Sequence, residues 1–333
     1  MSFSIFQDDL EVLRKKDFLI YLFGEGITHS KAPLMQNYLF KKLGCDGFVY
    51  ECLDSYGLEE FVKLIKANKN ATSWKDVNYI GSAVTMPYKV AIIPHLDEID
   101  ENARSVGAVN TIYVRFKNGK AINIGTNTDT VGIRDAFLFN TPVAAANAKG
   151  KPGLVYGGGG ASRSAVYALK EYLGCSKIYM VNRYASEVNQ IQEEMAANGF
   201  TGEIIHVATP EQAKEMESPY LLVLAVPDFP PVSDEEILAR ATLDVFINQE
   251  EKGAVIEMCY HPTQITRLYK AFHAAGWDVI GGIEPMIYQG FAQQVLWTGY
   301  ALDEMPTKEV VDYVRETIEE PCLRHDIVDA TKL

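Results

Sequence analysis

Apolar runs rich in β-branched and aromatic residues alternate with segments of helical period along this chain. In its first part, the pattern predicts strands at 18–23, 48–52 and 79–84, with helices at 34–43 and 58–67 between them. Such βαβαβ order is typical of parallel sheets covered by helices, so an α/β fold is expected.

A hairpin is expected next, because Asn118-Gly119 is a strong turn signal between the apolar runs 111–114 and 121–124. Residues 141–152 lack a strong period and predict a linker or surface loop. A second alternation follows, with strands at 153–156, 177–181 and 221–225 and helices at 161–172, 186–197, 289–296 and 307–318. At 333 residues, two domains of ordinary size are expected.

A glycine-rich turn opens the second alternation, between the strand that ends at Tyr156 and the next helix. This context is the one that a dinucleotide fingerprint requires, since glycines allow close backbone approach and the helix N-terminus faces the pyrophosphate. The residues expected to bind a dinucleotide there are Gly157, Gly158, Gly159, Gly160, Ala161 and Ser162.

The second strand of this half ends in Asn182-Arg183-Tyr184, where a dinucleotide's ribose is normally bound. In NADP-using proteins that resemble this chain, a base often stands at the position of Glu187. A carboxylate there would repel the 2′-phosphate of NADP, whereas Arg183 alone could stack on adenine. The sequence therefore favours NAD over NADP.

Composition narrows the classes of partner. The formal net charge of −13 and the absence of any concentrated basic patch disfavour nucleic acid. No apolar run is long enough for a membrane span, and the first residues do not resemble a signal peptide, so a cytoplasmic protein is expected. The cysteines are far apart, which predicts free thiols rather than a zinc site; they are Cys45, Cys52, Cys175, Cys259 and Cys322.

Five short segments together resemble one family, the shikimate/quinate dehydrogenases. They are Gly24–Pro33, Val84–Lys89, Gly107–Thr111, Asn127–Asp129 and Gly157–Arg163. The resemblance runs from about residue 19 to about residue 299. It implies an N-terminal α/β substrate domain (1–126 plus 284–333) and a Rossmann-type, doubly wound nucleotide-binding domain (127–283).

The resemblance also implies roles for individual residues. Lys89 would be the general acid/base and Asp129 its partner, as oxidation of an alcohol requires a group that takes the hydroxyl proton. Further substrate contacts are implied for Ser30, Ala32, Thr85, Asn110, Tyr260 and Gln289. Further cofactor contacts are implied for Asn182, Arg183, Val226 and Gly282. No metal is expected.

One departure from the family pattern bears on the substrate. Where the family has His-Ser-x-Ser-Pro, this chain has His29-Ser30-Lys31-Ala32-Pro33, so one hydroxyl contact to the substrate carboxylate is lost and space is gained. Quinate carries an extra tertiary hydroxyl at that carbon, which favours quinate over shikimate. Drift at a tolerated position is the competing interpretation.

The resulting prediction is an NAD-dependent quinate dehydrogenase, similar to the quinate-utilising fungal enzymes, that forms 3-dehydroquinate and has possible side activity on shikimate. An NADP-dependent shikimate dehydrogenase is the nearest alternative. A non-catalytic quinate or shikimate sensor is the alternative of another class. A monomer or homodimer is expected.

Overall fold

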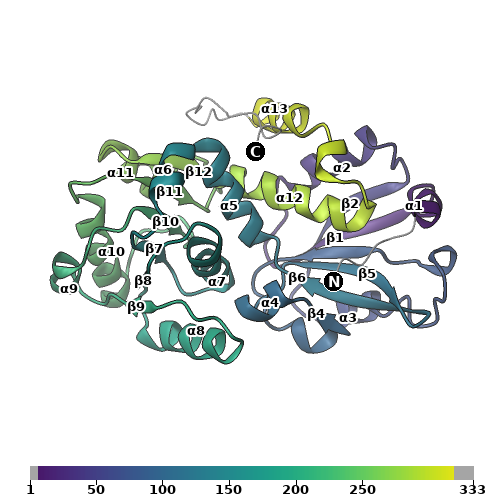
Figure 1. The fold of residues 1–333 in the computed structure, drawn as a ribbon, viewed down its shortest axis with the longest axis horizontal. Coiled ribbons are helices and arrows are strands. Elements are labelled where there is room, and N and C mark those ends of the chain that lie inside the picture. The colour runs from purple at the N-terminus through teal and green to yellow at the C-terminus, as the bar shows by residue number, and fades with distance from the viewer. Residues whose placement is uncertain (1–6, 319–333) are drawn as a thin grey trace. The chain divides into compact units, whose positions relative to one another are not determined.

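The computed structural model describes residues 7–318, which divide into two compact units. The first unit comprises the described residues up to Arg104, then Ala108–Thr128 and Gln289–Thr317. The second contains Ser105–Gly107 and Asp129–Tyr288. Both units have the α/β architecture expected from the sequence (Figure 1).

A six-stranded mixed sheet forms the centre of the first unit, in the order β2-β1-β3-β5-β6-β4. β1 pairs in parallel with β2 and β3, whereas β5 is antiparallel to β3 and β6. The strands are β1 Phe18–Gly24, β2 Phe48–Asp54, β3 Gly81–Val84, β4 Glu98–Ile99, β5 Thr111–Lys117 and β6 Lys120–Thr126. The helices with residues in this unit are α1 Gln7–Arg14, α2 Ala32–Lys42, α3 Glu59–Ile65, α4 Glu101–Val106, α12 Ile283–Thr298 and α13 Thr307–Thr317, with short 3₁₀ turns at Trp74–Asp76, Ile93–His95 and Leu302–Glu304.

Aromatic side chains attach helices to both faces of this sheet. On one face, Phe48 packs edge-on against Phe40 of α2, with ring centroids 5.2 Å apart. On the other face, Phe23 stacks on Phe61 of α3 at 4.2 Å. The strands predicted from these runs of β-branched and aromatic residues are confirmed. The Asn118-Gly119 hairpin is confirmed as well: Lys117 pairs with Lys120, and both turn residues have positive φ.

The second unit contains a six-stranded parallel sheet in the order β12-β11-β10-β7-β8-β9. This is the doubly wound order, with its switch point between β7 and β10. The strands are β7 Gly153–Tyr156, β8 Ile178–Val181, β9 Ile204–His206, β10 Leu221–Leu224, β11 Ala254–Glu257 and β12 Asp278–Gly281. The helices are α5 Asp129–Asn140, α6 Pro142–Asn147, α7 Gly160–Tyr167 with a π-helical turn at Ala168–Tyr172, α8 Ala185–Ala197, α9 Pro210–Glu215, α10 Asp234–Ile247 and α11 Arg267–Ala274.

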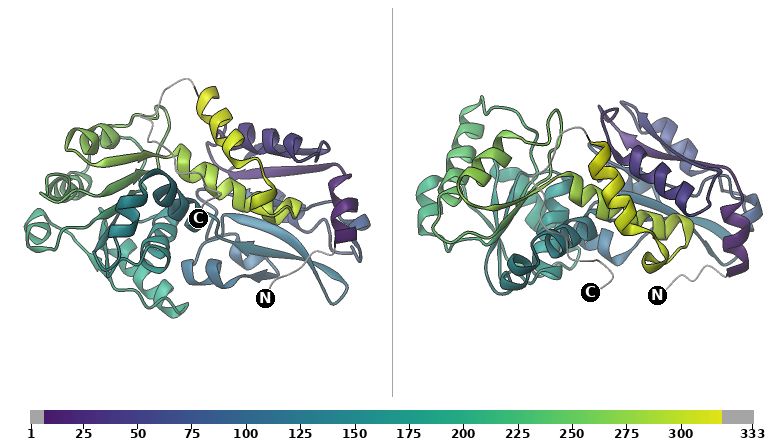
Figure 2. Two further views of the ribbon diagram at one scale, coloured as in Figure 1. Left: turned by 45° about the horizontal axis from the view of Figure 1, so that its top comes forward. Right: turned by 90° about the horizontal axis from the view of Figure 1, so that it is seen from above.

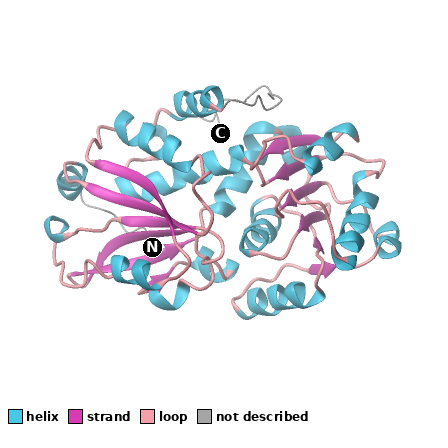
Figure 3. Cartoon of the chain, turned by 180° about the vertical axis from the view of Figure 1, so that it is seen from behind, coloured by secondary structure: helices cyan, strands magenta, loops and turns pink. Residues whose placement is uncertain are grey.

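Helices cover both faces of this sheet, as Figure 2 and Figure 3 show from several sides. A continuous apolar core joins inward-facing strand residues to α10 and α11, and includes Leu222, Val255, Phe246 and Phe272. The Rossmann-type prediction is therefore confirmed for this unit.

One prediction about local structure was wrong. The stretch 141–152 was expected to be a linker or loop, but Pro142–Asn147 forms helix α6. Pro142 stands in the first helical turn, where its missing N–H costs nothing, and Ala144 and Ala145 are buried. The alanines of this segment favour a helix, although the segment shows no polar–apolar period.

Candidate active site

Strands of the first unit bring several of the expected substrate residues to one edge of the sheet. β1 and β3 run in the same direction, and β3 ends at Val84. Antiparallel β5 begins at Thr111, opposite Thr126 at the end of β6. The segments that continue from these ends therefore lie at a common edge; they carry Thr85, Lys89, Asn110 and Thr128.

Lys89 lies in a turn that is fixed on both sides. Its carbonyl accepts a hydrogen bond of 2.7 Å from the N–H of Val109. Beside it, the hydroxyl of Tyr88 donates to the Glu25 carboxylate and lies 3.1 Å from the carbonyl oxygen of Ser55. Burial, with a smaller contribution from Glu25, raises the pKa of Tyr88 to about 12, so this hydroxyl keeps its proton. The backbone that presents half-buried Lys89 is thus held in place.

A polar cluster is centred on Asn110, which is almost fully buried. Its side-chain oxygen accepts from the N–H of Thr128 at 2.7 Å and from the hydroxyl of Thr111 at 2.8 Å. Its amide nitrogen donates to Thr128 Oγ1 at 3.0 Å and lies 3.4 Å from Gln289 Oε1. We call Asn110, Thr111, Thr128 and Gln289 the Asn110 cluster. Amide and hydroxyl groups of these kinds can both donate to and accept from the hydroxyls of a ligand.

Glutamine side chains on α2 and α12 form a chain of hydrogen bonds that ends at this cluster. Gln294 donates to Gln36 Oε1 at 2.6 Å, and Gln36 donates to Gln293 Oε1 at 2.9 Å. Gln293 in turn donates to Thr111 Oγ1 at 3.0 Å. This buried chain of amides fixes which atoms of the cluster remain donors and acceptors.

Ser30 and Ala32 stand at the start of α2. Ser30 Oγ accepts from the N–H of Ala32 at 3.2 Å, which leaves its hydroxyl hydrogen available to donate. Ala32 is buried and lies one helical turn before Gln36, which contacts the carbonyl of Gly290 at 3.4 Å. The position where the family has a second Ser therefore lies on the same face of α2 as Gln36.

The glycine loop of the second unit follows β7 at the switch point of the sheet. Gly157 has φ of 121°, and a Cβ there would lie 2.9 Å from the carbonyl oxygen of Ala225. Gly159, with an ordinary φ of −87°, has nothing within 4 Å of the place where a Cβ would stand. Open space over the backbone at the start of α7 is what a pyrophosphate requires, so the loop fits a dinucleotide. Ala161 and buried Ser162 continue α7 from Gly160.

The groups expected near a dinucleotide's ribose lie beside this loop. Asn182 donates to Glu187 Oε2 at 2.6 Å, and both side chains lie 2.7 Å from where a Cβ of Gly158 would stand. The charge of nearby Arg183 is already paired, because its guanidinium donates to Glu236 at 2.7 Å. The glycine loop therefore has the carboxylate of Glu187 beside it, whereas the positive charge of Arg183 is compensated by Glu236.

The remaining expected residues are placed by neighbouring elements. Val226 follows β10 and lies 3.1 Å from the Cβ position of Gly157. Gly282 follows β12, where a Cβ would lie 2.3 Å from the carbonyl oxygen of Met258. Tyr260 lies half-buried in the segment that follows β11. Asp129 is the first residue of α5, directly after Thr128 of the Asn110 cluster.

Three participants carry no assignment from the sequence. Thr128 was noted only as a neighbour of Asp129, although it contacts both Asn110 and Gln289. The hydroxyl of Tyr88 was not considered at all. Glu257 was given no role, yet its buried carboxyl accepts hydrogen bonds from Cys259 and Thr266, on either side of Tyr260. The partners of Thr128 and Tyr88 are distant in sequence, and those of Glu257 are brought to it by a turn of the segment after β11, so no local pattern revealed these contacts.

Within residues 7–318, no group of three or more His, Cys, Asp or Glu side chains is arranged to hold a metal ion. The four described cysteines are free thiols, and Cys322 lies outside the described residues. None of the described helices combines the length and apolar character needed to cross a membrane.

A doubly wound parallel sheet with an open glycine loop at its switch point, together with the buried polar Asn110 cluster of the first unit, is typical of a dinucleotide-dependent oxidoreductase. Residues 22–112 match the profile of the shikimate dehydrogenase substrate binding domain. A quinate dehydrogenase of Emericella nidulans is 38% identical over 322 residues, covering 92% of this chain and 95% of that protein. The chain belongs to the shikimate/quinate dehydrogenase family.

Solved structures agree with this assignment. The shikimate 5-dehydrogenase of Thermus thermophilus, in complex with NADP(H) and shikimate, is 27% identical. It matches 90% of this chain and 100% of its own with a TM-score of 0.67. The quinate dehydrogenase of Corynebacterium glutamicum, in complex with NAD, has a TM-score of 0.69 over 90% of this chain and 99% of its own. At 22% identity, that second likeness concerns the fold alone.

Proposed function

We propose that this chain is an NAD-dependent quinate dehydrogenase that interconverts quinate and 3-dehydroquinate, with shikimate as a poorer substrate. The observation that carries the proposal is the pairing of a carboxylate, Glu187, with the glycine loop while Arg183 is engaged by Glu236. Similarity to the Emericella nidulans quinate dehydrogenase supports the choice of substrate.

Each unit contributes a distinct set of binding groups to this proposal. Residues 157–162 would hold the pyrophosphate, and Asn182, Arg183, Val226 and Gly282 the rest of the dinucleotide. When bound, NAD supplies the hydride acceptor. The substrate would be held by Ser30, Ala32, Thr85, Tyr260 and the Asn110 cluster. The domain boundaries 1–126 plus 284–333 and 127–283 stay a prediction, as do the cytoplasmic location and the monomeric or homodimeric state.

Lys89 would carry the proton chemistry. Its amine takes the proton from the hydroxyl that is being oxidised and returns it in the reverse direction, and Asp129 assists as the partner carboxylate. Asn110 and Gln289 would hold neighbouring ring hydroxyls, because their amide and carbonyl groups offer both donors and acceptors. Ser30 would donate its hydroxyl hydrogen to the substrate carboxylate, as its oxygen already accepts from Ala32 N–H.

The direct test is to incubate the purified chain with quinate and NAD, to follow NADH by absorbance and to identify the product by chromatography. Formation of NADH and 3-dehydroquinate in equal amounts is expected. Binding of quinate without turnover, under conditions where the relatives are active, would instead support the non-catalytic sensor.

Changing Glu187 to Arg is expected to shift cofactor preference toward NADP by about 10-fold or more. The substitution removes a repulsion from the 2′-phosphate and adds a charge-assisted contact, of a kind worth roughly 1.5–3 kcal/mol. The measurement is the ratio of kcat/KM for NADP to that for NAD. Glu193→Arg is the matched control, because it makes the same charge change at an exposed position of the same helix. A wild type that already prefers NADP would contradict the assignment of NAD.

Changing Ala32 to Ser is expected to shift relative efficiency from quinate toward shikimate by roughly 3- to 10-fold. A second hydroxyl would contact the carboxylate, at about 0.5–1.5 kcal/mol, while crowding the tertiary hydroxyl of quinate. The readout is the quinate-to-shikimate ratio of kcat/KM. Ala67→Ser, at an exposed position just after α3, is the control. An unchanged ratio would mean that Ala32 does not determine specificity.

A further inference from the structure

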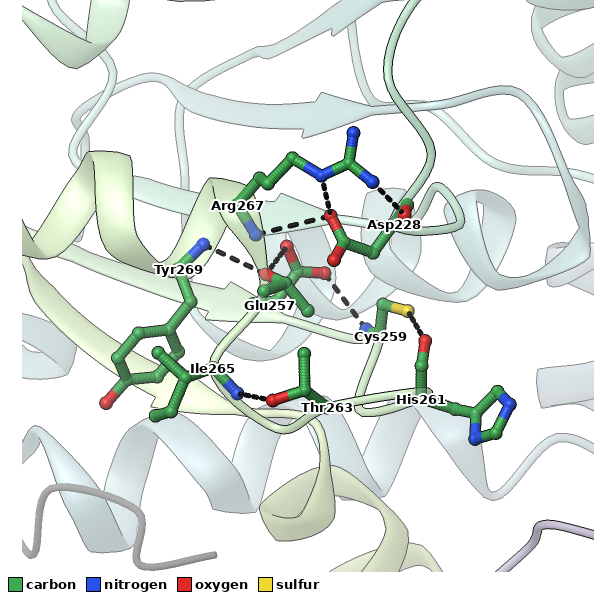
Figure 4. A network of polar contacts seen from close by, with 9 residues as sticks. Asp228, Glu257, Cys259, His261, Thr263, Ile265, Arg267 and Tyr269 are labelled. Atoms are coloured by element: carbon green, nitrogen blue, oxygen red, sulfur yellow. Dashed lines mark hydrogen bonds and ion pairs between the residues drawn. The ribbon is translucent and has the colours of Figure 1, made fainter.

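The segment between β11 and α11 is tied to the sheet at both of its ends by one side chain. Glu257, the last residue of β11, is 1% exposed. Its Oε1 accepts from the N–H of Cys259 at 2.9 Å, and its Oε2 accepts from the hydroxyl of Thr266 at 3.1 Å. Figure 4 shows this arrangement, with the carboxyl between the two ends of the segment.

The far end of the segment is also the beginning of a helix. Thr266 Oγ1 accepts from the N–H of Tyr269 at 3.0 Å and so caps α11. Next to it, Arg267 pairs with Asp228, which accepts from the backbone N–H of Arg267 at 3.2 Å. Glu257 therefore contacts the segment's first turn and, through Thr266, the cap of α11.

Tyr260 lies between these two attachments. It follows a strand whose neighbour, β10, leads directly to Val226 beside the glycine loop. Ligands of doubly wound sheets bind outside the carboxyl ends of the strands, and the Tyr260 segment occupies such a position. Gly282 adds a third restraint, since only a residue without Cβ fits against the carbonyl of Met258.

We propose that Glu257 is a positioning residue for the dehydrogenase reaction, which holds residues 258–266 so that Tyr260 is presented to the substrate. This inference rests on the proposed function, because it assumes that Tyr260 contacts the substrate. The carboxyl itself is buried, and it acts through the segment.

The geometry does not require a charged carboxylate. Burial is the main reason why the pKa of Glu257 rises to about 8, and the nearby charge of Asp228 adds to the effect. The carboxyl accepts from Cys259 N–H with one oxygen and from the Thr266 hydroxyl with the other. A glutamine would keep the first contact through its amide oxygen and the second by donating its amide N–H to Thr266 Oγ1. Gln is thus a conservative replacement, whereas Leu, of similar size, removes both attachments.

The test compares Glu257→Leu with Glu257→Gln at pH 7, each with and without Tyr260→Ala, by steady-state oxidation of quinate. Glu257→Leu is expected to lower kcat/KM by roughly 10- to 100-fold, the scale of a misplaced catalytic contact. Glu257→Gln should stay within about 3-fold of wild type. In the Tyr260→Ala background, Glu257→Leu should have little further effect, because the two positions act as one unit.

The proposal would be overturned if Glu257→Leu lowered kcat/KM equally in the wild-type and the Tyr260→Ala backgrounds. It would also be overturned if Glu257→Leu left kcat/KM unchanged in the wild-type background. If Glu257→Leu fails to fold, Thr266→Val and its control Thr266→Ser replace the pair, with only Val expected to reduce kcat/KM.

Amide hydrogen exchange of residues 258–266 gives a readout independent of activity. Faster exchange in Glu257→Leu but not in Glu257→Gln is expected, and equal exchange would overturn the proposal. If wild type turns over shikimate rather than quinate, the kinetic comparison is made with shikimate, so failure of the substrate assignment remains distinguishable from failure of the positioning role.

Discussion

Replacing Lys89 with Ala is expected to lower kcat by roughly 100-fold or more, as for loss of a general acid/base. KM for the hydroxy acid should change much less, since the Asn110 cluster and Ser30 remain to bind it. The structure restrains the backbone at this position, with the carbonyl of Lys89 bonded to Val109 and its neighbour Tyr88 bonded to Glu25. Loss of the amine should therefore leave the surrounding turn in place.

Steady-state kinetics of the variant beside Lys120→Ala, an exposed lysine of the β5–β6 hairpin, provides the measurement and its control. Lys120→Ala should behave as wild type. Near-normal kcat with a raised KM in Lys89→Ala would show that Lys89 binds substrate without transferring the proton.

The second large effect is expected in the glycine loop. Gly159→Ala should leave stability nearly unchanged but raise the Kd for NAD about 10-fold or more. The φ of Gly159 suits any residue, and its Cβ would meet no protein atom within 4 Å. The added methyl group would instead occupy the space into which a pyrophosphate approaches the backbone.

Gly157→Ala separates this binding effect from a folding effect. At φ of 121°, and with the carbonyl oxygen of Ala225 2.9 Å from the new Cβ, this variant should lose about 1–3 kcal/mol of stability. Thermal unfolding and calorimetric titration with NAD measure the two quantities. Unchanged NAD affinity in Gly159→Ala would place the dinucleotide elsewhere.

Much of the fold could be predicted from local sequence. Strands such as β1 and β8 are largely buried runs of β-branched and aromatic residues, and Asn118-Gly119 has the chemistry of a two-residue hairpin. The strands β4, β9, β11 and β12 were not predicted. The glycine loop was recognisable because a strand precedes it and a helix follows. Helix α6 was missed because its alanines show no polar–apolar period, although three successive alanines are strong helix formers.

The supporting contacts of the site could not be predicted in the same way. Gln36 and Gln293 are 257 positions apart, and their hydrogen bond depends on how α2 packs against α12. The role of Glu257 depends on its hydrogen bond to Thr266, which requires the segment between them to turn back toward the strand. Tertiary packing determines such contacts, and no local pattern encodes them.

The decisive measurement is a set of kcat/KM values for quinate and shikimate, each with NAD and with NADP, on the wild-type chain. We expect quinate with NAD to give the highest value, because Ala32 leaves room for the tertiary hydroxyl and Glu187 disfavours a 2′-phosphate. A highest value for shikimate with NADP would contradict both assignments and identify the chain as an NADP-dependent shikimate dehydrogenase.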